Sequence, residues 1–317
     1  MPSIYSIGSF IEKKFNNAQL GSISIEILLI LTAPIVNIRL LFQLLFIFLR
    51  KNDLLKHSKF NKIKKFKNKH IGERCFIIGT GPSLNVEDLN KLNNEICFSV
   101  NSIMKLFDKT DWQPSYYSFY CPTFYQKYKD LIHKAIADHK ITYIFLPHNR
   151  SKEQKKNIPS AIPFFRLLSS RPYTIINPHS SYYSRPNTVL DPDLTKYIYR
   201  GKFSGNAYAY VDGSHSIIPA IMQIAVYMGF NEIYLLGCDC GLNEGKMHFD
   251  GGEHVDEDLL KKIKEREYNA YIVTIRGYEA AKEYADTHGL KIYNATRGGK
   301  LEVFERIDLD NVLSLSQ

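Results

Sequence analysis

The stretch Cys75–Leu84, CFIIGTGPSL, decides the fold of this 317-residue chain. Four apolar residues run into a turn that has glycines at positions 79 and 81. A short apolar strand that breaks into a helix start is typical of α/β proteins, which often bind phosphate at that point. Glycine lets a backbone approach a ligand closely, and proline suits the first turn of a helix. We therefore expect a phosphate contact from this turn, which consists of Gly79, Thr80, Gly81, Pro82 and Ser83.

This turn differs from the two commonest phosphate-binding motifs. No lysine follows the glycines, which excludes a Walker loop, and Leu84 occupies the third glycine position of a dinucleotide fingerprint. The next expected strand ends at Asn101 instead of at an acid. An asparagine amide can both donate to and accept from a ribose hydroxyl or a base edge. Asn101 is therefore a candidate nucleotide contact, and a plain strand–helix connection with an asparagine cap is the alternative.

Apolar strands and amphipathic helices alternate from Ile71 onward. The expected strands are Cys75–Ile78, Ile96–Val100, Tyr116–Tyr120, Ile141–Leu146, Ile233–Leu236 and Ile292–Tyr293. The expected helices are Val86–Leu92, Thr123–His139, Ser216–Met228, Asp256–Lys264 and Thr274–His288. This order predicts an α/β fold with a doubly wound, mostly parallel sheet, Rossmann-like in a GT-A-like variant. In such sheets the ligand binds beyond the carboxyl ends of the strands, where the strand order reverses.

A second helix start lies in the stretch that leads to Asp239. Ser214 and Ser216 precede an apolar helix, and the early Pro219 is tolerated only near a helix start. The hydroxyls of these two serines suit a phosphate or a ribose. The helix leads into the strand Ile233–Leu236, and Asp239 follows at the carboxyl end of that strand. Asp239 is therefore a candidate catalytic residue, and the alternatives are a capped core helix and a capping aspartate.

Two histidines lie in a glycine-rich segment directly after that strand. The segment Gly245–His254, GKMHFDGGEH, contains His248 and His254 together with Asp250 and Glu253. Histidine is the side chain best suited to proton transfer near neutral pH. His248 and His254 are therefore candidate general bases, and inert surface histidines are the alternative.

The periodicity is lost between about residues 150 and 210, where proline, serine, tyrosine and arginine are frequent. A segment of this length without regular structure is more often a binding loop or lid than an accident. We expect it to cover the site and to bring Arg185 to a departing phosphate. Asp191 and Asp193 flank a proline with no strand before them, so we interpret them as a solvated turn.

The formal charge of +9 is concentrated in one segment. Residues 50–69 hold nine Lys or Arg and one acid, so their net charge is 9 − 1 = +8. An apolar stretch, Ile23–Leu49, precedes them and is interrupted by Glu26, Pro34, Asn37, Arg39 and Gln43. A single basic segment beside an apolar one indicates a membrane surface and not nucleic acid.

We therefore expect residues 1–70 to associate with a membrane and residues 71–317 to form the catalytic domain. The membrane contact would involve residues 23–69, as two helices separated at Pro34, Ser24–Ala33 and Ile35–Leu49, on the cytoplasmic face. A buried helical hairpin and a single membrane span are the alternatives.

The five cysteines form no set of paired metal-type spacings. Their pattern indicates a reducing compartment and no metal site at Cys238 and Cys240.

Four stretches in this order resemble a known family. They are FIIGTGPSL, VNS, GSHSIIPAIMQIAVYMGFNEIYLLGCD, and AAKEYADTHGLKIYNATRGGKLEVFERIDLD. Together they resemble the MptE-like family and the related family 42 sialyltransferases over residues 71–310. The resemblance implies a nucleotide-activated donor bound by the Gly79–Ser83 turn and Asn101. In the sialyltransferases this donor is a CMP-activated nine-carbon sugar acid, and no metal is needed. The tyrosines and the catalytic histidine of those enzymes have no counterpart at the matching positions here.

These observations predict a membrane-associated glycosyltransferase that moves a CMP-activated nonulosonic acid onto a glycan or lipid-linked acceptor. We expect no cofactor besides that donor. One alternative is an MptE-like diphosphokinase that uses ATP and Mg²⁺, with Asp239, Asp250 and Glu253 as metal ligands. The other is a nucleotide-binding protein at the membrane surface without catalytic activity.

Overall fold

The computed structural model describes most of the region downstream of residue 41. The described residues are 42, 45–55, 60–119, 122–147, 156–158, 162–165, 167–168, 202–212, 216–240 and 274–314.

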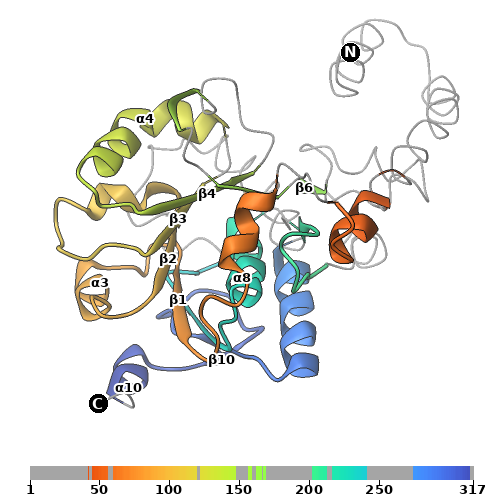
Figure 1. Ribbon diagram of the computed structural model, residues 1–317. Coiled ribbons are helices and arrows are strands. Elements are labelled where there is room, and N and C mark those ends of the chain that lie inside the picture. Colours follow the sequence, from red (N-terminus) through yellow and green to blue (C-terminus); the bar gives the residue numbers. More distant parts are fainter. Residues whose placement is uncertain are drawn as a thin grey trace, which may run out of the picture.

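The centre of the fold is an eight-stranded sheet in which every strand pair is parallel (Figure 1). Its strand order is β10-β9-β8-β1-β2-β3-β4-β5. The strands are β1 (Arg74–Ile78), β2 (Cys97–Val100), β3 (Tyr116–Ser118), β4 (Tyr143–Pro147), β5 (Ile162–Phe165), β8 (Glu232–Leu236), β9 (Lys291–Asn294) and β10 (Glu305–Arg306). All six strands expected from the sequence are present, and the α/β class with a parallel sheet is confirmed.

The direction of winding reverses between β1 and β8. From β1 the chain adds strands in one direction, through β2 to β5, and from β8 it adds β9 and β10 in the other direction. The two central strands are paired along their full length, from Arg74 opposite Glu232 to Ile78 opposite Leu236. The crevice expected from the sequence therefore lies beyond Ile78 and Leu236.

Side chains alternate between two cores, one on each face of the sheet, because successive residues of a strand point to opposite faces. In β1, Cys75 and Ile77 belong to one core, and Phe76 and Ile78 belong to the other. The first core is covered by α8 (Ile217–Tyr227), the helix 274–288 and the 3₁₀ helix η1 (Asn61–Phe66). The second is covered by α3 (Val86–Lys91), η2 (Asn101–Leu106), α4 (Pro122–Ala137) and α10 (Leu309–Ser314). Figure 1 shows α3 and α10 on the side of the sheet opposite the blue helix 274–288.

The lysine-rich segment is part of the globular fold. Phe60, Ile63 and Phe66 recur every three residues, as a 3₁₀ helix requires, and all three are buried in the first core. The folded part of the chain therefore includes residues upstream of residue 71, where we expected the catalytic domain to begin. The lysines of η1 extend from its outer side.

Residues 45–51 are helical and overlap the end of the second expected helix, Ile35–Leu49, most of which lies outside the described residues. Within the described residues, none of the helices combines the length and the apolar composition needed to cross a bilayer. The first expected helix, Ser24–Ala33, lies outside the described residues, as does the expected helix Asp256–Lys264.

The insert contains strands that the sequence pattern did not predict. β5 extends the sheet beyond β4, and β6 (Leu167–Leu168) pairs with β7 (Val211–Asp212) in a separate parallel pair. The two ends of the insert therefore have regular structure. Residues 169–201 lie outside the described residues, so the lid remains a prediction.

Candidate functional site

The glycine turn after β1 packs directly against the segment that follows β8. The N–H of Gly79 donates to Leu236 O and that of Gly81 donates to Gly237 O, both at 2.8 Å. A Cβ added at Gly79 would collide with Gly237 O, and one added at Gly81 would collide with the carboxylate of Asp239. Both positions therefore need glycine because two loops of the protein meet there, whereas the sequence had suggested a close approach to a ligand.

Asp239 connects the two loops through its side chain. Its Oδ2 accepts a hydrogen bond of 2.8 Å from the Ser83 hydroxyl. The side chain is buried, and its Oδ1 has no hydrogen-bond partner among the described residues. Burial raises the pKa of this carboxyl above its ordinary value, and the hydrogen bond from Ser83 opposes that shift. In this geometry Asp239 positions the turn, and its role in catalysis remains a prediction.

Asn101 occupies the expected place at the carboxyl end of β2. It is the first residue of η2 and has a φ of 46°, in the left-handed region that asparagine tolerates better than most residues. The Tyr117 hydroxyl donates to Asn101 O at 2.7 Å, which fixes the backbone there. The amide side chain remains a predicted nucleotide contact.

Ser216 caps the helix α8. Its hydroxyl accepts from the N–H of Ile218 at 3.4 Å, and almost all side chains of the helix are buried. Ser216 is therefore a helix cap, which was the alternative considered from the sequence.

Four predicted site residues lie outside the described residues: Arg185, Ser214, His248 and His254. The general base therefore remains a prediction from the sequence.

The loop after β9 belongs to the site, although the sequence analysis did not include it. The Thr296 hydroxyl accepts from the N–H of Cys238 at 3.0 Å. The guanidinium of Arg297 donates to both carboxylate oxygens of Asp88, at 2.7 and 2.5 Å, and to Ser83 O at 3.1 Å. The loops after β1, β8 and β9 are therefore joined at the carboxyl edge. The signal that could have identified this loop is TRGGK directly after the strand.

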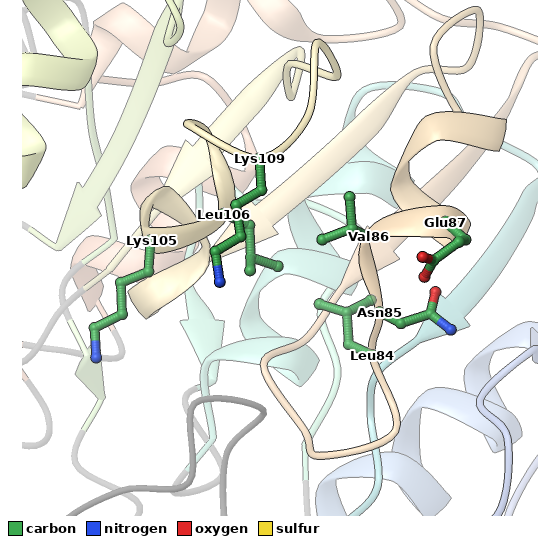
Figure 2. Close-up of a pocket in the computed structure, with 7 residues that line it drawn as sticks. All are labelled: Leu84, Asn85, Val86, Glu87, Lys105, Leu106 and Lys109. Carbon is green, nitrogen blue, oxygen red and sulfur yellow. The ribbon is translucent and has the colours of Figure 1, made fainter.

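A shallow pocket of ≈ 420 Å³ lies beside the glycine turn, between the start of α3 and η2 (Figure 2). Leu84, Val86 and Leu106 form its apolar part, and Lys109 reaches from beyond η2 toward the gap between them. Asn85, Glu87 and Lys105 complete the lining. The lining therefore combines an apolar part with groups of both charges, Lys105 and Lys109 against Glu87.

Burial disfavours the thiolate form of the two cysteines near the site. Cys238 is buried, and burial raises the pKa of its thiol above the ordinary value. Burial also raises the pKa of Cys240, to about 12.

Within the described part of the chain, no group of three or more His, Cys, Asp or Glu is arranged to hold a metal ion.

Fold and site together define an α/β protein whose strand order reverses between β1 and β8, with the loops after β1, β8 and β9 joined at that point. The chain belongs to the MptE-like family, because the family model described as 6-hydroxymethylpterin diphosphokinase MptE-like matches residues 49–245, more than half of its length. The resemblance inferred from the sequence is thereby confirmed.

Two solved structures show limited similarity to this chain. The sialyltransferase CstII from Campylobacter jejuni, solved with cytidine-5′-monophosphate, has 16% sequence identity and a TM-score of 0.40. That match covers 75% of this chain and 85% of CstII. The MAf glycosyltransferase from Magnetospirillum magneticum AMB-1 has 14% identity and a TM-score of 0.44, over 80% of this chain and 38% of that chain. A comparison with curated proteins gave no match.

Proposed function

We propose that the chain is a transferase that binds a nucleotide-activated sugar in the crevice between β1 and β8. The observation that carries this proposal is the interlocked set of loops after β1, β8 and β9 at the switch point of the sheet. The donor that we propose is a CMP-activated acidic sugar, and the acceptor is a surface glycan or a lipid-linked precursor. Lys109, which reaches toward the pocket of Figure 2, suits the acidic group of such a donor.

The proposed reaction is a displacement at the anomeric carbon of the sugar. The bond between that carbon and the phosphate oxygen breaks, a bond to the acceptor oxygen forms, and the acceptor hydroxyl loses its proton. His248 or His254 accepts this proton, because imidazole is the side chain best suited to do so near neutral pH. The departing phosphate needs a positive field, which Arg185 supplies together with polar groups at the carboxyl edge.

The position of Asp239 supports metal-free transfer. Mg²⁺ prefers exposed carboxylate oxygens in a hydrated site, whereas this carboxylate is buried and bound to Ser83. Asp239 is one of the three acids that the diphosphokinase alternative requires. The other two, Asp250 and Glu253, lie outside the described residues.

Family membership favours a second function, transfer of pyrophosphate from ATP to a small alcohol in the presence of Mg²⁺.

A thermal-shift panel with CMP, CDP, UDP and ATP, each with and without Mg²⁺, separates the glycosyltransferase from the diphosphokinase. The glycosyltransferase proposal predicts stabilisation by CMP that does not change when EDTA is added. Stabilisation by ATP alone, and only with Mg²⁺, would replace it with the diphosphokinase.

Membrane association is part of the proposal. Leu45, Phe46 and Phe48 of the helix 45–51 are exposed. Exposed lysines of the neighbouring basic segment would attract anionic lipids on the cytoplasmic face: Lys62, Lys65, Lys67 and Lys69. Such a location would bring the enzyme to a lipid-linked acceptor.

The membrane contact can be tested by co-sedimentation of the full chain with vesicles that contain phosphatidylserine. A variant with Leu45, Phe46 and Phe48 replaced by serine should remain in the supernatant. Truncation through residue 69 is unsuitable because it removes the buried Phe60, Ile63 and Phe66. If the triple variant sediments as the unmodified chain does, this part of the proposal is wrong.

A further inference from the structure

We propose that the loop at residues 296–300, TRGGK, binds the phosphate of the nucleotide donor and that Lys300 supplies the cation. This inference rests on the proposed function for the identity of the nucleotide. This inference adds the loop after β9 to the glycine turn after β1, whose own phosphate contact remains a prediction.

The guanidinium of Arg306 fixes the orientation of the loop. Its Nη1 donates to Thr296 O at 3.0 Å and to Gly298 O at 2.7 Å. Its Nη2 donates to Gly299 O at 3.4 Å. Three carbonyl groups of the loop are therefore turned toward one side chain behind it.

The N–H groups of the same peptides point to the opposite side, because the C=O and the following N–H of a trans peptide are antiparallel. These are the N–H groups of Arg297, Gly299 and Lys300. The N–H of Lys300 donates to Asp239 O at 2.7 Å. The described residues provide no acceptor for the N–H groups of Arg297 and Gly299. The N–H groups of Arg297 and Gly299 therefore remain available as donors to an anion.

The two glycines allow the tight course of the loop beside Asp239. Gly298 and Gly299 have φ values of 64° and 74°, a conformation that glycine adopts without strain. A Cβ at Gly299 would lie 2.7 Å from both Cα and O of Asp239. The loop therefore lies directly against Asp239, in the segment that follows β8 at the switch point.

The two cations of the loop have different environments. Arg297 is engaged by the buried Asp88 and by Ser83 O. Lys300 is exposed, and in the described part of the chain it has no acidic partner. Two free N–H groups and one uncompensated ammonium group suit a phosphate, which accepts several hydrogen bonds at once.

The experiment measures binding to the full chain by isothermal titration calorimetry, with CMP, cytidine and inorganic pyrophosphate as separate ligands. The variants are Lys300→Gln and Lys300→Arg. Lys282→Gln is the matched control, since Lys282 is exposed on the helix 274–288 and the charge change is the same. Loss of one charge-assisted contact should weaken CMP binding about tenfold in Lys300→Gln, with little change in Lys300→Arg or the control.

Cytidine is the internal reference, because it has no phosphate. Its affinity should be equal in all four proteins. The proposal is overturned if CMP binds Lys300→Gln as tightly as the unmodified chain, or if cytidine binding falls in parallel with CMP binding. It is also overturned if the unmodified chain binds none of the three ligands.

The pyrophosphate titration separates this inference from the proposed function. Pyrophosphate binding that depends on Lys300, without CMP binding, would support the loop as a phosphate site and contradict the CMP-sugar donor. CMP binding that does not depend on Lys300 would leave the donor in place and overturn the role of the loop.

Discussion

The two ends of the central sheet use charged groups in opposite ways. At the amino end, Arg74 pairs with Glu95 and Glu232 pairs with Lys291. At the carboxyl end, Asp239 is buried with a free Oδ1, and Lys300 has no acidic partner in the described part of the chain. Since an unpaired buried polar atom lowers stability, we propose that these two groups of the carboxyl end serve a ligand, although Arg297 and Asp88 pair there, and that the amino end serves stability.

A hydrogen-bonded network around His70 and Tyr116 connects polar groups at the amino end. The imidazole Nδ1–H of His70 donates to Glu73 at 2.5 Å, and its Nε2 lies 2.6 Å from the Tyr116 hydroxyl. Lys69 donates to the same hydroxyl at 3.2 Å. The ring of His70 also stacks on Phe230, with the centroids 4.5 Å apart. Changes in this network should affect folding and leave ligand binding intact.

The largest difference between the two ends should appear at glycines on either side of β1. Gly81→Ala places a methyl group against Asp239 and 2.7 Å from Gly237 O, so we expect a loss of about 3 kcal/mol in the free energy of unfolding. Gly72 has a φ of 80° with no atom within 4 Å of an added Cβ. Gly72→Ala should therefore cost about 1 kcal/mol, for backbone strain alone.

Urea denaturation of both glycine variants measures these losses, and CMP binding measures the effect on the site. Gly81→Ala should abolish binding, and Gly72→Ala should leave it unchanged. Equal losses of stability in the two variants would contradict the close packing of the loops at the carboxyl end.

Arg297→Ala should have the second largest effect. It leaves the buried Asp88 without its bidentate partner and releases Ser83 O, so we expect about 2 kcal/mol of destabilisation. Arg297→Lys retains the charge but loses the fork geometry, and should recover less than half of this loss. Thermal unfolding of the three proteins, with and without CMP, tests this order. If both variants match the parent, Arg297 does not hold the turn.

The main features of the fold could be predicted from local sequence patterns. Apolar runs bounded by glycine and charged residues identified six strands, and their alternation with helices gave the parallel sheet. The core position of η1 was missed because lysines surround Phe60, Ile63 and Phe66, and a three-residue repeat resembles neither an α-helix nor a strand.

The candidate site could be predicted only in part. Gly79, Gly81 and Asp239 were recognised because they directly follow apolar strands. Arg297 and Arg306 were missed because their role depends on where β9 and β10 pair in the sheet. Arg297 contacts Asp88, 209 residues earlier in the sequence, and no periodic pattern connects residues at that separation.

Tyr116→Phe should lower stability by about 1 kcal/mol, because it removes one hydroxyl and leaves the imidazole Nε2 of His70 without this partner. CMP affinity should not change, since Tyr116 lies at the amino end of β3. Chemical denaturation and calorimetry of the same preparation provide both values. A fall in CMP affinity without a fall in stability would contradict the assignment of the amino end to stability.

The smallest effect should come from Asp239→Asn, and it should depend on pH. Because burial raises the folded-state pKa of this carboxyl, both states are protonated below its ordinary value of 3.8 and its ionisation costs no stability there. As the pH rises from 3.8 through the raised folded-state pKa, the carboxylate form destabilises the protein. The asparagine variant has no such cost, so its stability relative to the unmodified chain should increase over this interval and then level off. Urea midpoints measured across that range test the sign, and a relative stability that falls with rising pH would show that Asp239 is stabilised as a carboxylate.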